Sequence, residues 1–354
     1  MKKSQKHELR KHIGDLQSIC GFKDYTFNDG PARGVRAFDL KNGKNIQMTI
    51  LADRGLDISH LSYKGINMSF SSKVGIRSPH LYTENGSRGF LRQFNAGMLT
   101  TCGITYAGAA GDDNGRELGL HGPYSNLPAE QICAEMIGHD DDILINVRGL
   151  IRESCVFSEN MLLQRSLILE TEKDIVRIHD NVENQGFSKE PVMLVYHINF
   201  GYPMLDSGSM IYSSAGLVTP RDGAASKGMS KFDLMEVPGI ERPEECFFHT
   251  DLPDNDAFVM LNNDKLKLAA IIRFDGKVFP LLCEWKCMRA GDYALGLEPT
   301  TSGVANRSIA RENGTLTYLE PGDSREYGIT LEFTDDPAVI GHYRNASGMA
   351  RQAR

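Results

Sequence analysis

The chain has 354 residues, of which 41% are hydrophobic and 24% are charged. This balance is typical of a globular protein, and a chain of this length buries roughly three-quarters of its unfolded surface, which excludes disordered and fibrous architectures. Lys and Arg total 39 against 46 Asp and Glu, so the net charge is −7. Such a chain lacks the basic surface that binds phosphate backbones or anionic lipid, and we expect neither a nucleic-acid nor a membrane partner.

The N-terminal residues and the cysteines indicate the compartment. Residues 1–10 have no apolar stretch of the kind found in signal peptides, and no apolar run long enough to span a membrane occurs elsewhere. The seven cysteines are odd in number and scattered, which favours free thiols over a disulfide framework. Cys283 and Cys287 have no second pair at zinc spacing, so we predict structural thiols and no metal. We expect a cytoplasmic protein.

The first predicted element is an amphipathic helix over residues 4–20. Its apolar residues recur at helical spacing, at Leu9, Ile13, Leu16 and Cys20. Beyond residue 20 helical patterns are scarce, and the period of the pattern changes to two, which is typical of strands. Residues 46–50 alternate between apolar and polar side chains, so we predict a strand there.

The clearest strand pattern runs from residue 161 to residue 205. Residues 161–169 and 175–182 alternate, and an acidic turn separates them. Residues 192–202 are apolar on both faces except at His197 and Asn199, so this strand is expected to lie deep in a sheet. The alternation over residues 325–333 predicts a closing strand.

Three polar segments are predicted to be loops. Residues 108–115 are rich in glycine but lack the lysine of a phosphate-binding loop and the strand-to-helix context of a dinucleotide fingerprint, so we predict a mobile loop. Residues 139–142, a histidine followed by three aspartates, are predicted to form a hairpin loop. Residues 251–256 carry three aspartates without the glycine and glutamate of a calcium loop, which favours a solvated turn.

Many short strands with turns rich in Gly, Asn and Asp predict an all-β fold, either a sandwich or a barrel. The sequence contains no low-complexity linker, no long run of like charges and no repeat of fixed period that would divide the chain. We therefore predict one large β domain over residues 26–340, preceded by a short helical segment at residues 1–25. Residues 341–354 are predicted to form a loose tail.

Two histidines stand where an all-β core disfavours polar side chains. His121 lies between glycines after a long loop, where the backbone can approach a ligand closely. The alternative is a loop histidine held by local hydrogen bonds. His197 shares a face with Asn199 in the middle of a strand, and its alternative is a core histidine whose hydrogen bonds are satisfied.

Glu298 is the third such residue. It shares a strand face with Ala294 and Gly296, and these small residues leave an open floor beside the carboxylate. The alternative is a surface glutamate at the end of a strand. Two histidines, an asparagine and a glutamate, without a nucleophile or metal spacing, indicate proton transfer on a polar, neutral ligand.

At these residues the chain resembles the aldose 1-epimerase (galactose mutarotase) superfamily, and more closely its uncharacterised DUF4432 branch. The segments similar to the epimerases are Leu120-His121-Gly122, His197-Ile198-Asn199-Phe200 and Leu297-Glu298-Pro299. Their order and approximate spacing agree. Residues 52–58 and 95–103, and Trp285 with Gly291-Asp292-Tyr293, are similar to the DUF4432 branch.

The resemblance implies a large antiparallel β-supersandwich with a sugar-binding cleft and no cofactor. It assigns Glu298 as the general base, His197 as the general acid and His121 as a residue that holds the sugar. Glu298 would take the proton of the anomeric hydroxyl while His197 protonates the ring oxygen, so that the ring opens and recloses as the other anomer. This requires an ionised Glu298 and a protonated His197, which ordinary pKa values of roughly 4.3 and 6.5 allow near neutral pH.

The chain also departs from the epimerase pattern. The segment that supplies an arginine in the epimerases is absent. Arg92 stands roughly in its place and Arg54 is a second candidate, each either a substrate contact or a member of an ion pair. An aspartate of the epimerases has no clean counterpart, and His249 and Asp251 are candidates for its position.

Asn199 and Trp285 complete the predicted substrate-binding residues, with core packing as the alternative for Trp285. The favoured function is that of a mutarotase acting on a free monosaccharide or a derivative such as a sugar acid. One alternative is a carbohydrate-binding protein without turnover, and another is a lyase or isomerase that abstracts a proton beside a carbonyl. The expected partner is a small carbohydrate, and a homo-oligomer is left open.

Overall fold

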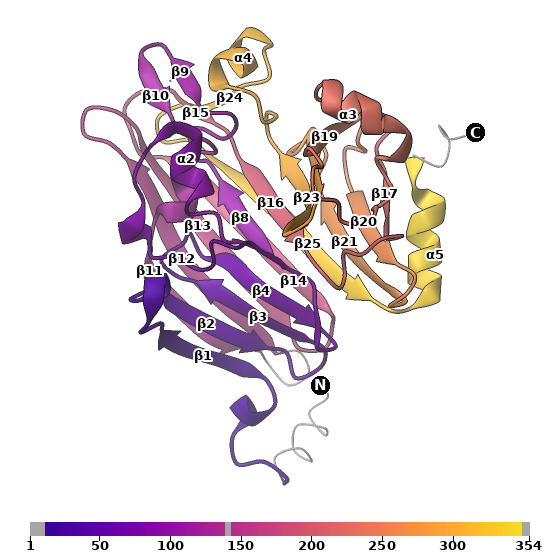
Figure 1. The fold of residues 1–354 in the computed structure, drawn as a ribbon. Helices are drawn as coiled ribbons and strands as arrows, with labels where there is room; N and C mark the ends of the chain where they lie inside the picture. The colour runs from indigo at the N-terminus through magenta and orange to yellow at the C-terminus, as the bar shows by residue number, and fades with distance from the viewer. Residues whose placement is uncertain (1–10, 139–142, 349–354) are drawn as a thin grey trace.

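The computed structural model describes residues 11–138 and 143–348 (Figure 1). Residues 139–142, predicted to form a hairpin loop, lie outside this described part. Within it, antiparallel sheets form the body of the molecule, so the prediction of an all-β fold is confirmed. No helix of the described part is long and apolar enough to cross a membrane.

The largest sheet has eight strands and contains the strongest alternating pattern. In spatial order its strands are β11 (Ala129–Ile137), β12 (Leu144–Ser154), β13 (Asn160–Glu170), β14 (Ile175–Asn184), β25 (Ser324–Thr334), β21 (Leu268–Phe274), β20 (Ala257–Asn263) and β17 (Met210–Ser213). In β13 the side chains of Leu163, Leu167 and Leu169 are buried, whereas Gln164 on the other face is exposed. The predicted closing strand, β25, pairs with β14 and β21 in the middle of this sheet.

A second sheet has six strands and carries His197, Asn199 and Glu298. In spatial order its strands are β18 (Leu217–Pro220), β19 (Glu245–Thr250), β22 (Leu281–Arg289), β23 (Asp292–Thr300), β16 (Val195–Phe200) and β8 (Leu99–Cys102). All six residues of β16 are buried, as predicted for a strand deep in a sheet. The strand is shorter than the predicted range of 192–202. Val192 belongs to β15 (Glu190–Val192), which pairs with β24 (Thr317–Leu319), and a turn follows Phe200.

The third sheet has five strands and covers part of the first. Its strands are β1 (Gly21–Thr26), β2 (Arg36–Lys41), β3 (Ile46–Leu51), β4 (Asp57–Tyr63) and β5 (Ile66–Asn67). β3 confirms the strand predicted at residues 46–50. Its Met48 and Ile50 belong to the same apolar core as Val147 and Leu167 of the eight-stranded sheet. Figure 1 shows β2–β4 lying across β12–β14, so this core separates the two sheets.

Short elements close the ends of the sheets. They are β6 (Phe70–Ser71) paired with β7 (Ala96–Gly97), β9 (Gly111–Asp113) paired with β10 (Arg116–Leu118), the helices α2 (Gly86–Leu91), α3 (Gly223–Gly228), α4 (Arg307–Glu312) and α5 (Pro337–Ala346), and the 3-10 turns η1 (Leu16–Ser18), η2 (Gly30–Ala32), η3 (Pro79–Leu81), η4 (Tyr124–Asn126) and η5 (Met229–Lys231).

The prediction of an N-terminal helix is wrong for residues 11–20. This part of the chain contains only the 3-10 turn η1. The Asp15 side chain accepts a hydrogen bond from Gln17 N at 2.9 Å and caps this turn, and β1 begins at Gly21. A side chain that caps a short turn competes with continuation of a longer helix. Residues 1–10 lie outside the described part.

Residues 341–348 of the predicted loose tail, and the glycine-rich loop, are also more ordered than predicted, whereas residues 349–354 lie outside the described part. Residues 341–346 belong to α5, which Asp336 caps at its N-terminus, and the Ser347 hydroxyl donates to Ser213 O at 2.9 Å. Residues 111–118 form the β9–β10 hairpin instead of a mobile loop. The guanidinium of Arg307 donates to Asp113 at 2.6 Å and ties this hairpin to α4.

A buried arginine joins the three large sheets. Arg165 of β13 donates to both carboxylate oxygens of Asp180 in β14, at 2.9 and 2.7 Å. It also donates to Asp57 of β4 at 2.8 Å and to the Thr101 hydroxyl of β8 at 2.9 Å. The Tyr196 hydroxyl of β16 donates to Asp180 at 2.6 Å. Because every partner is buried, each group depends on the others for its hydrogen bonds.

We expect Arg165→Met to lower the free energy of unfolding by about 3–5 kcal/mol, because it leaves two carboxylates buried without their cation. Urea denaturation measures the effect. Arg33→Met is the control, since the exposed Arg33 donates only to a backbone carbonyl, Asn28 O. A loss no larger than that of the control would contradict a structural role for the buried network.

Candidate active site

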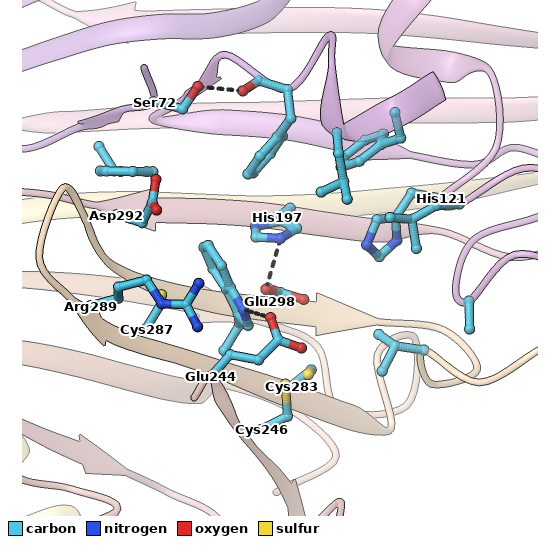
Figure 2. A pocket seen from close by; sticks show the side chains of 18 of the residues that line it. Ser72, His121, His197, Glu244, Cys246, Cys283, Cys287, Arg289, Asp292 and Glu298 are labelled. Atoms are coloured by element: carbon cyan, nitrogen blue, oxygen red, sulfur yellow. Dashed lines mark hydrogen bonds and ion pairs between the residues drawn. The ribbon is translucent and has the colours of Figure 1, made fainter. Parts of the chain in front are cut away.

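A cavity of about 620 Å³ opens on one face of the six-stranded sheet. Strands β16, β19, β22 and β23 supply its floor, and the segments at residues 70–74, 90–94 and 120–121 supply its sides. Among the residues predicted from the sequence, His121, His197, Trp285 and Glu298 line this cavity together. Figure 2 shows His121, His197 and Glu298 facing the same space.

His197 and Glu298 lie opposite each other on neighbouring strands. The register of β16 with β23 pairs Val195 with Thr300 and Ile198 with Leu297, which brings His197 across from Glu298. The distance from His197 Nε2 to Glu298 Oε1 is 3.2 Å. Both side chains are at least nine-tenths buried. A proton held by one of these groups is therefore within reach of the other.

Gly296 makes room for the carboxylate of Glu298. A Cβ atom at Gly296 would lie 2.4 Å from Glu298 Oε1, which is too close, and 3.1 Å from His197 Cε1, which is tight. The carboxylate thus bends back over a residue without a side chain. The space above Gly296 that was expected to stay open is therefore occupied by Glu298 itself.

Burial shifts the proton affinities of this pair in opposite directions. Desolvation, aided by the charge of Glu244, raises the pKa of Glu298 to about 8. Desolvation, aided by His121, lowers the pKa of His197 to about 3, and Asn199 opposes this fall by hydrogen bonding. At neutral pH the free protein therefore holds a protonated Glu298 and a neutral His197. The charge states expected from ordinary pKa values are wrong for this buried pair.

His121 approaches the pair from a loop. Its φ of 62° lies in the left-handed region, and its backbone N–H donates to Gly108 O at 2.8 Å. Gly122 follows with a positive φ of 70°, and a Cβ there would lie 2.2 Å from Tyr106 O. The ring centres of His121 and His197 are 5.9 Å apart. Burial lowers the pKa of His121 to about 4, so it is neutral near pH 7.

Aromatic rings enclose the histidines. The Phe94 ring lies 5.2 Å from the His197 ring, and the Phe90 ring lies 4.8 Å from the His121 ring, measured between centres. The Trp285 ring lies 5.4 Å from that of His197, and its Nε1 donates to Glu244 at 2.9 Å. These faces can pack against the C–H groups of a sugar ring, while the histidines and Glu298 remain available to its oxygens.

The other predicted binding residues do not line the cavity. Arg54 is buried and donates to Gln93 O at 2.9 Å and to Arg77 O at 3.2 Å, so it supports the segment that precedes Phe94. Arg92 is exposed at the end of α2. Asn199 lies buried below His197 and donates to its carbonyl at 2.8 Å.

His249 and Asp251 also lie elsewhere. His249 contacts Glu284 at 2.9 Å between His249 Nε2 and Glu284 Oε2, and both side chains are fully buried. Glu284 and Trp285 are consecutive on β22 and point to opposite faces, so this pair lies on the side of the sheet away from the cavity. Asp251 is an exposed turn residue with a φ of 53°.

Sequence reasoning missed several cavity residues. Glu244, Arg221, Arg289 and Cys246 were not identified. Cys283 and Cys287, predicted to be structural thiols, also line the wall. A signal was present, because Cys283, Trp285 and Cys287 alternate and must share one strand face. A hydrogen bond with Cys246, together with burial, raises the pKa of the Cys283 thiol, and burial raises that of the Cys287 thiol, so both are neutral and weakly nucleophilic.

The sequence matches, over residues 32–333, the family described as a domain of unknown function, DUF4432. The chain belongs to this family. No curated protein matches the sequence at a significant level.

Solved structures share the fold. A Klebsiella pneumoniae protein provisionally named an aldose 1-epimerase superposes with a TM-score of 0.87 at 23% identity, over 96% of this chain and 89% of that chain. A galactose mutarotase-like protein from Clostridium acetobutylicum has a TM-score of 0.63 at 14% identity, over 90% of this chain and 99% of that chain. A galactose 1-epimerase from Lactobacillus acidophilus has a TM-score of 0.56 at 13% identity, over 89% of this chain and 99% of that chain. The fold is therefore galactose mutarotase-like, which confirms the expected supersandwich.

We expect the Glu298→Gln variant to have a higher free energy of unfolding than wild type, by an amount that grows as the pH rises. An unfolded glutamate ionises near its ordinary pKa of 4.5, whereas folded Glu298 keeps its proton to about pH 8. Between these values the unfolded state gains free energy from ionisation that the folded state does not, so wild-type stability falls by a few kcal/mol at most, at about 1.4 kcal/mol per pKa unit. Glutamine is spared this loss.

The measurement is thermal or urea unfolding at pH 5 and pH 9, with the exposed Glu326→Gln as the control. The free energy of unfolding of Glu298→Gln should differ little from that of wild type at pH 5 and should clearly exceed it at pH 9. A difference that does not change with pH would contradict a buried, protonated Glu298.

Proposed function

We propose that the protein is a cofactor-independent aldose 1-epimerase, or mutarotase, acting on a free monosaccharide or a sugar derivative. The observation that carries this proposal is the buried His197–Glu298 pair at the floor of a cavity walled by aromatic rings. Mutarotation needs one group that gives a proton to the ring oxygen and one that takes a proton from the anomeric hydroxyl. The pair supplies both.

The number of protons on the pair fits this task. With a pKa of about 3 for His197 and about 8 for Glu298, the pair carries a single proton over the whole range between. When the proton is on Glu298, the carboxyl is the donor and the imidazole the acceptor. When it is on His197, the roles are those assigned by the resemblance. Transfer across the 3.2 Å between Oε1 and Nε2 interconverts the two forms.

Both forms occur in one reaction cycle. Ring opening moves a proton from one member of the pair to the ring oxygen and another from the anomeric hydroxyl to the other member. The open aldehyde then rotates about the bond to its carbonyl carbon, and reclosure returns both protons with the roles exchanged. Burial favours the form with two neutral side chains in the free protein, and hydrogen bonds from the sugar would decide which form opens the ring.

The relatives support the reaction class. The Lactobacillus acidophilus protein is named a galactose 1-epimerase, and the Klebsiella pneumoniae protein is provisionally named an aldose 1-epimerase. Their low identity leaves the sugar to be found by experiment. We propose that the enzyme is cytoplasmic. Two further cavity residues would hold the sugar, His121 by a hydrogen bond and Trp285 by stacking on the sugar ring.

We expect Glu298→Gln and His197→Ala each to lower catalysed anomer exchange by about 10²–10⁴-fold, because each removes one proton-transfer group. NMR exchange spectroscopy on a panel of aldoses and uronic acids, with the buffer rate subtracted, measures this, and Glu326→Gln serves as the exposed control. If a sugar binds and every variant including wild type leaves exchange at the buffer rate, the protein is a binder. A change of configuration at another carbon would indicate a lyase or isomerase instead.

The dependence of kcat/KM on pH should show a plateau between two limits. Above about pH 8 the pair loses its only proton and no donor remains, so catalysed exchange should fall. Below about pH 3 His197 takes up a second proton and the pair has no acceptor left. Exchange measured from pH 2 to pH 10 checks both limits. A profile that falls through pH 6.5, the ordinary pKa of histidine, would contradict the proposed proton count.

A further inference from the structure

The mouth of the cavity carries three cations and two carboxylates. Lys73 pairs with Asp292 at 2.8 Å, and Arg221 pairs with Glu244 at 3.1 Å. The third cation is Arg289, which also lines the cavity. Within residues 11–138 and 143–348, no carboxylate forms an ion pair with Arg289. Because both acids are already paired, the positive charge of Arg289 is the one left uncompensated at the mouth.

The position of Arg289 is fixed although its charge is unpaired. Its Nε donates to Arg242 O at 3.1 Å, which leaves the two terminal nitrogens of the guanidinium for another acceptor. Figure 2 shows the guanidinium directed into the cavity, toward the part that holds His197 and Glu298. A guanidinium anchored through Nε presents its remaining donors at little cost in side-chain entropy.

The spacing along β22 fits one sugar unit. Arg289 lies four residues beyond Trp285, which is about 13 Å of strand at roughly 3.3 Å per residue, and an arginine side chain reaches back over several ångströms of this length. The Trp285 ring in turn lies 5.4 Å from the ring of His197. A sugar stacked on Trp285 with its anomeric carbon at His197 would therefore direct its opposite end toward Arg289.

We propose that Arg289 binds an anionic substituent, a carboxylate or a phosphate ester, carried by the substrate at the end of the sugar remote from the anomeric carbon. This inference rests on the proposed function and names the substrate class of the same site: an acidic sugar rather than a neutral aldose. Arginine is suited to this role because its planar fork of donors matches the paired oxygens of carboxylates and phosphates.

The neighbouring charges are compatible with an anion at this position. The carboxylate of Glu244 is held by Arg221 and by Trp285 Nε1, and the carboxylate of Asp292 is held by Lys73. Arg242, whose carbonyl anchors Arg289, is itself paired with Glu236 at 2.8 Å. Both carboxylates at the mouth therefore already have cationic partners, whereas a bound carboxylate or phosphate would give Arg289 the partner that it lacks.

The experiment compares sugars that differ only at the remote substituent: D-glucose, D-glucuronate and D-glucose 6-phosphate, and the same three in the galacto series. Anomer exchange with buffer rates subtracted gives kcat and KM, and isothermal titration calorimetry gives affinity. For wild type we expect an acidic sugar to have a kcat/KM about tenfold or more above that of its neutral counterpart. The two acidic series show whether the carboxylate or the phosphate is the preferred group.

Arg289→Gln should raise KM for the acidic sugar about tenfold or more with little change in kcat, and leave the neutral sugar unaffected. Arg289→Lys should raise KM for the acidic sugar less than Arg289→Gln does, because lysine keeps the positive charge but lacks the paired donors of the guanidinium. Arg33→Gln is the matched control, since Arg33 is exposed, lies outside the cavity and also donates through Nε to a backbone carbonyl.

The outcomes separate the inference from the proposed function. If neutral and acidic sugars exchange equally well and Arg289→Gln changes neither, the enzyme is a mutarotase and the inference is overturned. If no sugar exchanges faster than in buffer but an acidic sugar binds with an affinity that depends on Arg289, the proposed function fails and the anion site stands. If acidic sugars are preferred but Arg289→Gln leaves the preference intact, another residue binds the anion and the inference is overturned.

Discussion

The guanidinium group of Arg165 is the interaction on which the rest of the structure depends. It pairs with Asp180 of its own sheet and with Asp57 of the five-stranded sheet, and it donates to Thr101 of the six-stranded sheet. Tyr196 completes the network by donating to Asp180. Because consecutive residues of a strand point to opposite faces, the network holds β16 from its core side and leaves the next residue, His197, on the cavity side.

The Arg165 network and the His197–Glu298 pair are both buried, and the free-energy cost of burying charge is offset differently in each. Arg165 keeps its charge, because a guanidinium cannot be deprotonated in a protein and five donors reach fixed acceptors. The His197–Glu298 pair lies within 3.2 Å but has no such set of partners, and its proton can move from imidazole to carboxyl to leave both groups neutral. The Arg165 network therefore contains a permanent ion, whereas the His197–Glu298 pair of the candidate site can become neutral.

Much of this arrangement is predictable from sequence because burial in a sheet has a period of two. The alternating pattern predicts β13, β14 and β25, but it cannot predict that β25 inserts between β14 and β21, since strand partners depend on contacts remote in sequence. His197 and Glu298 stand out as polar residues in apolar strands. His249 gives the same local signal, yet its partner, Glu284, lies on the other side of the sheet from the cavity. Arg289 gives no such signal, because it is the last residue of β22 and its position at the cavity depends on where the β22–β23 hairpin turns.

The cavity has a largely apolar part and a charged part, and this division would orient a substrate in the proposed reaction. Around His197 the neighbours are aromatic rings and neutral thiols, so little in the wall stabilises a separated charge. At the mouth, Lys73, Arg221 and Arg289 form a charged rim. A sugar with a charge at one end would keep that end at the rim, because moving the charge beside the aromatic rings costs desolvation energy. Its uncharged hemiacetal end would then lie at the pair, which would pass between its neutral form and its ion-pair form as it exchanges two protons with the sugar.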